Sequence, residues 1–281
     1  MTSNYFINFF QFLYYNKAQR NLYMGHVRLG RLPKTYRWKQ VVTSLADNSS
    51  SLPEIVKLTS KASEKVLADT KNTEGLSHCF WLFTNIAQAS RQGDFVEGLN
   101  NLGMNIKPDD SGVKILKQIF DSASISVRKN GNISVLDQIA IDSFKNAIHN
   151  TISAESTSLF GCNLDSIQRA FKKYSTSKQV SDLGREYFSN YMNNAFSFAL
   201  EKELANSISK ESRFQNSNDI QQFNAKLKQY CWDVSKIVEE FSGGWYGKHS
   251  FEGDIADKKK TKDFTSYVIT KLLSEVQRED N

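Results

Sequence analysis

The chain has few of the residues that interrupt or cross-link a fold. Only three of its 281 residues are proline and three are cysteine. Because proline breaks helices and is common in turns, its scarcity favours long helices with short connections. Cys79, Cys162 and Cys231 are odd in number and widely separated, which argues against a disulfide framework and a cysteine-based zinc site. We expect Cys79 and Cys231 to be reduced, small core residues.

Long hydrophobic runs are also missing. No segment approaches the roughly 18 consecutive apolar residues that a membrane-spanning helix requires. The aromatic start, MTSNYFINFFQFLYYNKAQR, lacks a basic leader and a small-residue cleavage site, so we expect no signal peptide and a cytoplasmic protein. Its aromatic residues recur at helical spacing. This pattern favours docking on the core or on a partner subunit over lying on a membrane, because the polar face carries Asn and Gln rather than bases.

Acidic residues are absent from positions 1–46, although the whole chain has 30 acidic and 36 basic residues. Seven bases lie in this stretch: Lys17, Arg20, Arg28, Arg31, Lys34, Arg37 and Lys39. The rest of the chain is close to neutral, so the formal net charge of +6 comes entirely from this first part. Such segregated positive charge favours an anionic partner.

Aromatic residues alternate with bases in HVRLGRLPKTYRWKQ, residues 26–40. One interpretation is a surface for nucleic acid or another anionic partner. Its contacts would be made to phosphates by Arg28, Arg31, Lys34, Arg37 and Lys39 and to bases by the rings of Tyr36 and Trp38. In the other interpretation the leucines, Tyr36 and Trp38 pack on the body while the basic head groups stay in water. No recognised nucleic-acid motif accompanies the charge, and both interpretations stay open.

Apolar residues at helical spacing dominate the rest of the chain. They predict an all-α protein, an irregular multi-helix bundle of about nine to eleven helices with short connections. Pro53 and Glu54 mark a helix start after a run of serines. The most regular pattern runs from Ile220 to Phe241, which we interpret as one helix in a bundle seam. Gly243-Gly244 would then provide its left-handed C-terminal cap.

The expected organisation has two parts. Residues 1–46 form a basic, aromatic segment, and residues 47–281 form a helical body with a candidate sub-boundary near residues 155–163. Asn130-Gly131 predicts either a hairpin or a connection between two helices. We prefer the connection because no other strand is evident and an isolated hairpin is only marginally stable.

The stretch FSGGWYGKHSFEGD, residues 241–254, is the best candidate for chemistry. A histidine beside acids is typical of a general base, so His249 with Glu252 or Asp254 is the candidate catalytic set of a hydrolase-like or nuclease-like enzyme. The alternative is a histidine that caps a helix or stacks near Trp245. The spacing His-x-x-Glu-x-Asp matches no established ligand pattern, so we predict no metal and no cofactor. Walker A, G-x-G-x-x-G and G-x-S-x-G motifs are absent from the sequence.

Three segments together resemble a set of uncharacterised bacterial proteins from mobile genomic islands. They are GRLPKTYRW (30–38), RQGDFVEGLNNLGM (91–104) and EEFSGGWYGKHSFEG (239–253). Such islands often carry multi-gene anti-phage defence operons. The resemblance implies no activity and no catalytic residues, but it does imply an accessory subunit of a multi-protein system.

The leading hypothesis is therefore a non-enzymatic adaptor or accessory subunit that meets an anionic protein partner through residues 1–46. The second hypothesis is direct binding of DNA or RNA by the same bases. The third is the enzyme centred on His249.

Overall fold

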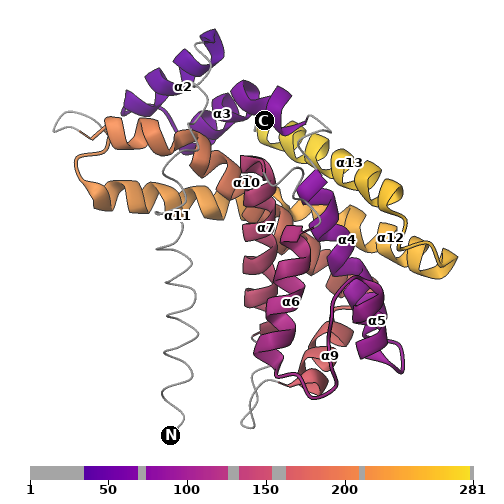
Figure 1. Ribbon diagram of the computed structural model, residues 1–281. Helices are drawn as coiled ribbons and strands as arrows, with labels where there is room; N and C mark the ends of the chain where they lie inside the picture. Colours follow the sequence, from indigo (N-terminus) through magenta and orange to yellow (C-terminus); the bar gives the residue numbers. More distant parts are fainter. Residues whose placement is uncertain (1–34, 69–73, 126–132, 154–162, 209–212, 279–281) are drawn as a thin grey trace, which may run out of the picture.

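The computed structural model describes residues 35–68, 74–125, 133–153, 163–208 and 213–278 (Figure 1). Within these ranges every regular element is a helix, which confirms the predicted all-α class. The elements are α2 (Tyr36–Ala46), α3 (Leu52–Leu67), α4 (Glu74–Ala89), α5 (Phe95–Asn101), α6 (Gly112–Ile125), α7 (Val135–Ile148), the π-helix η1 (His149–Ser153), α9 (Leu164–Lys173), α10 (Ser177–Asn206), α11 (Ser217–Val234), α12 (Lys236–Glu252) and α13 (Lys258–Gln277). Eleven α-helices in the described ranges agree with the expected nine to eleven. None of these helices combines the length and the apolar character needed to cross a membrane.

Several sequence-based predictions lie outside the described residues. They concern the aromatic start, the bases up to Lys34, Cys162, the Asn130-Gly131 pair and nearly all of the candidate sub-boundary near residues 155–163. The described helices on either side of Asn130-Gly131 are α6, which is described to Ile125, and α7, which begins at Val135.

Local sequence sets the start of several helices. The side chain of Ser51 accepts a hydrogen bond from the backbone N–H of Glu54, and a proline lies in the first turn of α3, as predicted. Ser134 accepts likewise from the N–H of Asp137 at the start of α7. Asn216 begins α11 with a capping box. These side chains satisfy N–H groups that a helix cannot pair internally.

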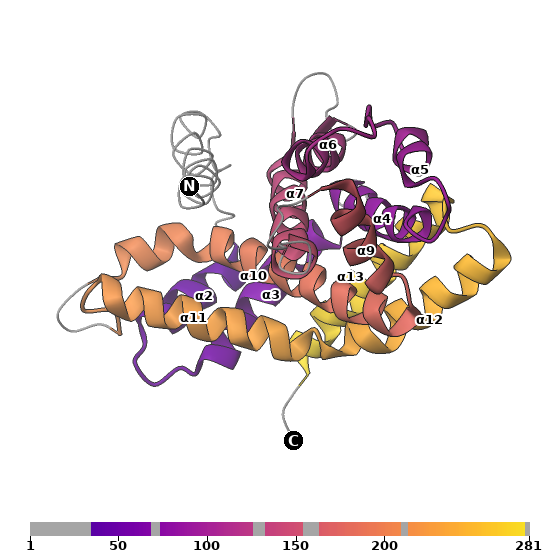
Figure 2. The same ribbon diagram turned by 90° about the horizontal axis from the view of Figure 1, so that it is seen from below.

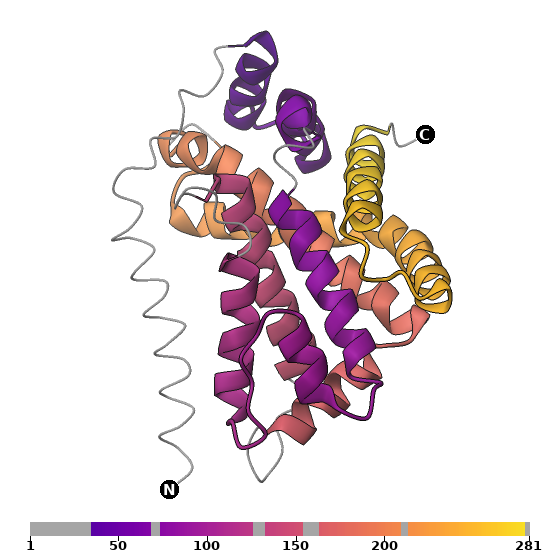
Figure 3. The same cartoon turned by 45° about the vertical axis from the view of Figure 1, so that its right-hand side comes forward.

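Helix α4 lies at the centre of the body. It packs against α7 on one side and α13 on the other, and it also touches α5, α6 and α9. In Figure 3 the violet α4 runs between the magenta helices α6 and α7 and the yellow helices α12 and α13. Nearly all of its side chains are buried, and the ring of Phe80 meets those of Phe188, Trp245 and Phe264. A helix with apolar residues on every side is stable only in such a position.

The two described cysteines are core residues, as predicted. Cys79 of α4 and Cys231 of α11 are both buried and unpaired. Burial raises the pKa of each thiol to about 12, so neither is a thiolate near neutral pH.

Helix α10 is the longest element, with 30 residues, and α11 and α12 both pack against it (Figure 2). The prediction of one helix from Ile220 to Phe241 is wrong, because α11 ends at Val234 and α12 begins at Lys236. A side chain from α10 holds this joint. Arg185 donates to the carbonyl oxygen of Trp232 from Nε at 3.1 Å and from Nη2 at 3.0 Å.

The same guanidinium also engages the helix that follows the joint. Its Nη1 lies 2.6 Å from Oε1 of Glu239 in the first turn of α12, and its carbon lies 4.1 Å above the ring of Trp232. Arg185 therefore satisfies a carbonyl at the end of α11 and pairs with an acid at the start of α12, which stabilises a break there.

The predicted C-terminal cap at Gly243-Gly244 is also wrong. Helix α12 continues through both glycines and ends at Gly253, whose φ is 74°. Gly243 is needed for packing, because a Cβ at this position would lie 2.6 Å from the carbonyl oxygen of Ser177 on α10. The weak helix propensity of glycine is therefore overridden by a close crossing of two helices.

Candidate functional site

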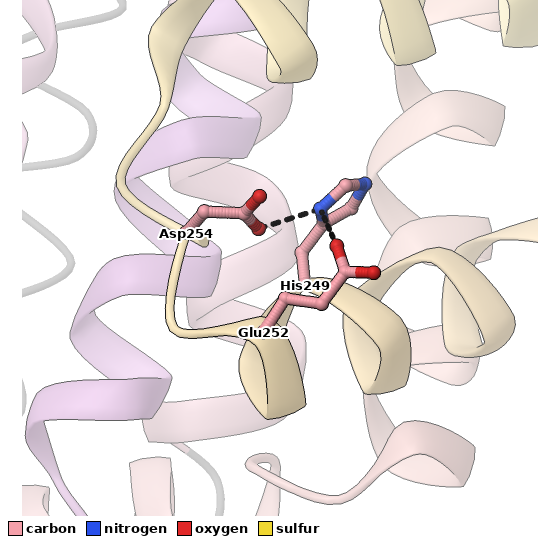
Figure 4. A group of neighbouring side chains, drawn as sticks. All are labelled: His249, Glu252 and Asp254. Atoms are coloured by element: carbon pink, nitrogen blue, oxygen red, sulfur yellow. Dashed lines mark hydrogen bonds and ion pairs between the residues drawn. The ribbon is translucent and has the colours of Figure 1, made fainter.

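His249 lies in the last turn of α12, where the chain reverses and brings acids back towards the ring. Gly253 adopts the left-handed conformation, and the backbone N–H groups of Gly253 and Asp254 both donate to the carbonyl oxygen of His249. Any other residue would be strained at this φ, so glycine fixes the turn. The turn places the carboxylate of Asp254 against the imidazole (Figure 4).

Two carboxylates approach the same ring nitrogen. Nδ1 of His249 lies 2.6 Å from Oδ1 of Asp254 and 3.5 Å from Oε2 of Glu252. In Figure 4 the two carboxylates approach Nδ1 from different directions, and Nε2 points away from Asp254. His249 is only 8% exposed, whereas the side chain of Glu252 is 41% exposed. The fold thus brings together all three residues that the sequence singled out in this stretch.

Neighbouring side chains fix the ring and one of the acids. The ring of Trp245, one turn earlier, has its centroid 4.9 Å from that of His249, so the predicted proximity of these two rings is present. Lys260 of α13 pairs with Oδ2 of Asp254, the oxygen that does not face His249. Hydrogen bonds from Lys260 and from His249 hold the pKa of Asp254 below its ordinary value. This carboxyl group is therefore ionised at neutral pH.

The loop that carries Asp254 is anchored to the central helix α4. Nε1 of Trp81 donates to the carbonyl oxygen of Ala256 at 2.8 Å, and Nδ2 of Asn85 donates to that of Ile255 at 3.3 Å. The ammonium of Lys258 lies 4.6 Å above the ring of Trp81. Because α4 is buried on every side, these contacts hold the turn beside His249 in a fixed position.

The cluster has the groups for acid–base chemistry or for metal binding. An acid that orients a histidine is present, and one nitrogen and two carboxylate oxygens lie within 4.8 Å of one another. Such N and O donors suit a divalent transition metal. A cavity of about 660 Å³ lies elsewhere, between the ends of α3 and α13, and is lined by none of the three residues. The enzymatic hypothesis therefore stays a prediction that rests on the hydrogen bond to Asp254.

The basic segment is described only from Thr35 onward. Tyr36 is 76% exposed and Lys39 is exposed, whereas Trp38 is 7% exposed and belongs to the core. Trp38 thus follows the packing interpretation, and Tyr36 is the aromatic ring that remains accessible. Arg28, Arg31 and Lys34 lie outside the described residues.

Arg37 is held loosely by α3. Its Nη1 donates to the carbonyl oxygen of Lys61 at 2.9 Å and lies 3.7 Å from Oε2 of Glu64, with both side chains about half exposed. Exposed pairs of this kind contribute little to stability and are screened by salt, so Arg37 remains accessible to an anionic partner.

Sequence reasoning missed two bases that the fold places beside these sites. Lys61 is exposed and its backbone touches Arg37, but 24 residues separate them and no local pattern indicates the contact. Lys260 pairs with Asp254. The sequence does carry a signal for Lys260, because Asp257 at the start of DKKKTK is an N-cap. This cap places Lys260 in the first turn of α13, facing the preceding loop.

Neither family models, curated proteins nor solved structures give a significant match to this chain. These comparisons therefore assign no function, and the resemblance to genomic-island proteins stays a prediction.

Proposed function

We propose that the chain is a non-enzymatic accessory or adaptor subunit that binds an anionic partner through its basic N-terminal region. The observation that carries this proposal is the placement of seven bases and no acid within residues 1–46. A stretch with only one sign of charge attracts polyanions over long range and speeds their association. The resemblance to genomic-island proteins supports a bacterial multi-protein system, such as an anti-phage defence operon, as the setting.

The attachment of the segment to the body supports the same function. Helix α2 carries the last two of these bases, Arg37 and Lys39, and is fixed in the core by Trp38, Val41 and Leu45, which are at most 7% exposed. A partner bound to the segment would therefore be tethered to a rigid anchor rather than to a loose tail. For the same reason, deleting residues 1–46 would remove core side chains, so charge substitutions are the sounder test.

Exposed bases continue from α2 onto the neighbouring helix. Arg37 and Lys39 on α2 are exposed, as are Lys61 and Lys65 on α3. Residues 47–68 carry three bases and three acids, so α3 adds exposed lysines but no net positive charge. The surplus of positive charge that would attract an acidic partner therefore belongs to residues 1–46.

An acidic protein surface is the partner class that we favour, because the resemblance implies a multi-subunit system. Nucleic acid is the second candidate, and one observation favours it: the ring of Tyr36 is 76% exposed beside Arg37 and Lys39. Exposed aromatic rings flanked by bases stack on nucleobases and bind phosphates.

Two probes separate these partners. The full chain would be titrated at low salt into a fluorescent single-stranded oligonucleotide and, separately, into a fluorescent polyglutamate peptide of the same charge. Binding of the peptide with equal or higher affinity supports an acidic protein partner, whereas clear preference for the oligonucleotide supports nucleic acid. If neither probe binds at low salt, the proposal is wrong.

A charge-matched pair of variants localises the binding. Arg31→Glu with Arg37→Glu should weaken it strongly. Lys226→Glu with Lys228→Glu makes the same change in net charge on exposed positions of α11 and should leave it nearly intact. Equal losses in both double variants would show that total charge, and not residues 1–46, governs binding.

A further inference from the structure

We propose that His249, Glu252 and Asp254 form a binding site for one divalent transition-metal ion, with zinc as the best fit. This site uses none of residues 1–46 and does not depend on the function proposed for them. Its donors are one imidazole nitrogen and two carboxylate oxygens, all within 4.8 Å of one another. Zinc binds such ligands at about 2.0–2.2 Å, and three protein ligands leave a fourth position for water.

Two of the three distances between ligand atoms, those that involve Nδ1, are close to what zinc requires. Two ligands on a tetrahedral zinc ion lie roughly 3.3 Å apart, as follows from its bond lengths and angles. Oε2 of Glu252 is 3.5 Å from Nδ1 of His249, and Oδ1 of Asp254 is 2.6 Å from it. The aspartate oxygen must therefore move away by less than about 1 Å. Rotation of the side chains provides this movement, because Asp254 and Glu252 are 29% and 41% exposed and have room to turn.

The orientation of His249 suits ligation through Nδ1. A bound metal needs the lone pair of Nδ1, so the ring proton must lie on Nε2, which points away from Asp254 (Figure 4). The ring of Trp245, with its centroid 4.9 Å away, limits rotation of the imidazole. The left-handed turn at Gly253 fixes the backbone between the ligands.

Glu252 is the part of the cluster that a simple histidine–aspartate hydrogen bond does not explain. Asp254 alone would satisfy Nδ1, yet a second carboxylate approaches the same nitrogen from another direction. The two carboxylates repel one another, and the ammonium of Lys260, which pairs with Asp254, offsets only one of the two negative charges. A divalent ion at Nδ1 would neutralise both.

Lys260 has a place in the loaded site. It pairs with Oδ2 of Asp254 and leaves Oδ1 facing the imidazole, which is the outer-shell arrangement that orients metal-bound carboxylates. Two carboxylates and one ammonium give the cluster a net charge of −1 around a neutral imidazole. The attraction of a divalent cation therefore outweighs its repulsion by Lys260.

Calorimetric titration of the full chain with zinc chloride, after treatment with a chelator, tests this site. We expect one saturable equivalent with a dissociation constant in the micromolar range or below. Glu252→Gln should weaken binding at least tenfold without impairing folding, because its side chain lies largely at the surface. His249→Gln and Asp254→Asn should abolish it. The matched control is Glu240→Gln, an exposed acid on the same helix, which should bind as the wild type does.

Cobalt(II) distinguishes this site from binding at a cysteine elsewhere in the chain. Ligation by nitrogen and oxygen gives visible d–d absorption without a thiolate charge-transfer band, and the Glu252→Gln variant should lose that absorption. The absence of saturable zinc binding, a thiolate band in the cobalt spectrum, or equal affinity in the wild type and all three ligand variants would overturn the proposal.

Discussion

Gly243 of α12 lies so close to Ser177 of α10 that a Cβ on the glycine would come within 2.6 Å of the serine carbonyl oxygen. A Cβ on the next residue, Gly244, would meet no neighbouring atom within 4 Å. Two adjacent glycines of one helix therefore have opposite roles. Gly243 permits the crossing of α10 and α12, whereas Gly244 only weakens the helix.

This contrast predicts opposite effects on stability. Gly243→Ala should lower the free energy of unfolding by about 1–3 kcal/mol, because the methyl group meets backbone that cannot move away. Gly244→Ala should raise it by about 0.5–1 kcal/mol, as alanine is the better helix former. Urea denaturation of the two variants measures both changes. Effects of the same sign would contradict the close packing of these helices.

Arg185 predicts a second large effect, at the joint between α11 and α12. Arg185→Met should destabilise the protein by roughly 2–4 kcal/mol, because it leaves a carbonyl and the carboxylate of Glu239 without their donor. The side chain of Arg185 is only 14% exposed. Arg169→Met on the exposed face of α9 removes the same charge and should change stability by less than about 0.5 kcal/mol. Equal thermal denaturation midpoints for the two variants would be inconsistent with this role.

His78 on α4 predicts a pH dependence of stability. Its ring stacks on Trp81, with centroids 5.6 Å apart, and its Nε2 is buried with no hydrogen-bond partner in the described part of the chain. Burial, aided by the charge of Lys258, lowers its pKa from 6.5 to about 4. Between these values the unfolded chain binds a proton that the folded chain does not. The free energy of unfolding should therefore fall as pH drops from about 6.5 to 4, by roughly 2 kcal/mol from this residue.

The comparison with His78→Phe isolates this contribution. Phenylalanine preserves the stacking and needs no hydrogen bond, so the variant should lose less stability than the wild type over the same pH range. Denaturant unfolding at several pH values measures the difference. Parallel pH profiles for the two proteins would exclude His78 as the source.

Lys260 gives a prediction specific to the proposed metal site. Lys260→Met removes the ammonium that orients the carboxylate of Asp254 and should weaken zinc binding by about tenfold or more. Lys248→Met, an exposed lysine on α12 without an ion pair in the described residues, should have little effect. Calorimetry measures both affinities. Unchanged or tighter binding by Lys260→Met would contradict this orienting role of Lys260.

Local signals in the sequence predicted much of the fold. Ser51 with Glu54, and Ser134 with Asp137, mark helix starts because the groups that cap a helix lie three residues from one another. The joint at Ser235 has no such signal. Its cause is Arg185, 47 residues before the carbonyl of Trp232 that it holds. A regular apolar pattern continues across the break because both helices face the same core.

The candidate site was predictable in its residues but not in its geometry. A helix that ended at Gly243-Gly244 would leave His249 in a loop. In the structure His249 lies in the last turn of α12. The true end, Gly253, brings Asp254 back onto the imidazole, and Lys260 arrives from the next helix. Spacing along the chain cannot show such a cluster, because a left-handed turn and a second helix create it.

The proposed role of residues 1–46 is tested most directly by the salt dependence of binding to a polyanion, measured by fluorescence anisotropy with the full chain and a single-stranded oligonucleotide. The logarithm of the association constant should fall steeply and linearly with the logarithm of salt concentration. Reversing Arg31 and Arg37 to Glu should reduce that slope by at least about 1.4, since each neutralised phosphate contributes roughly 0.7. Reversing Lys226 and Lys228 should preserve the slope. Binding that is insensitive to salt, or equally reduced slopes in both double variants, would contradict the account.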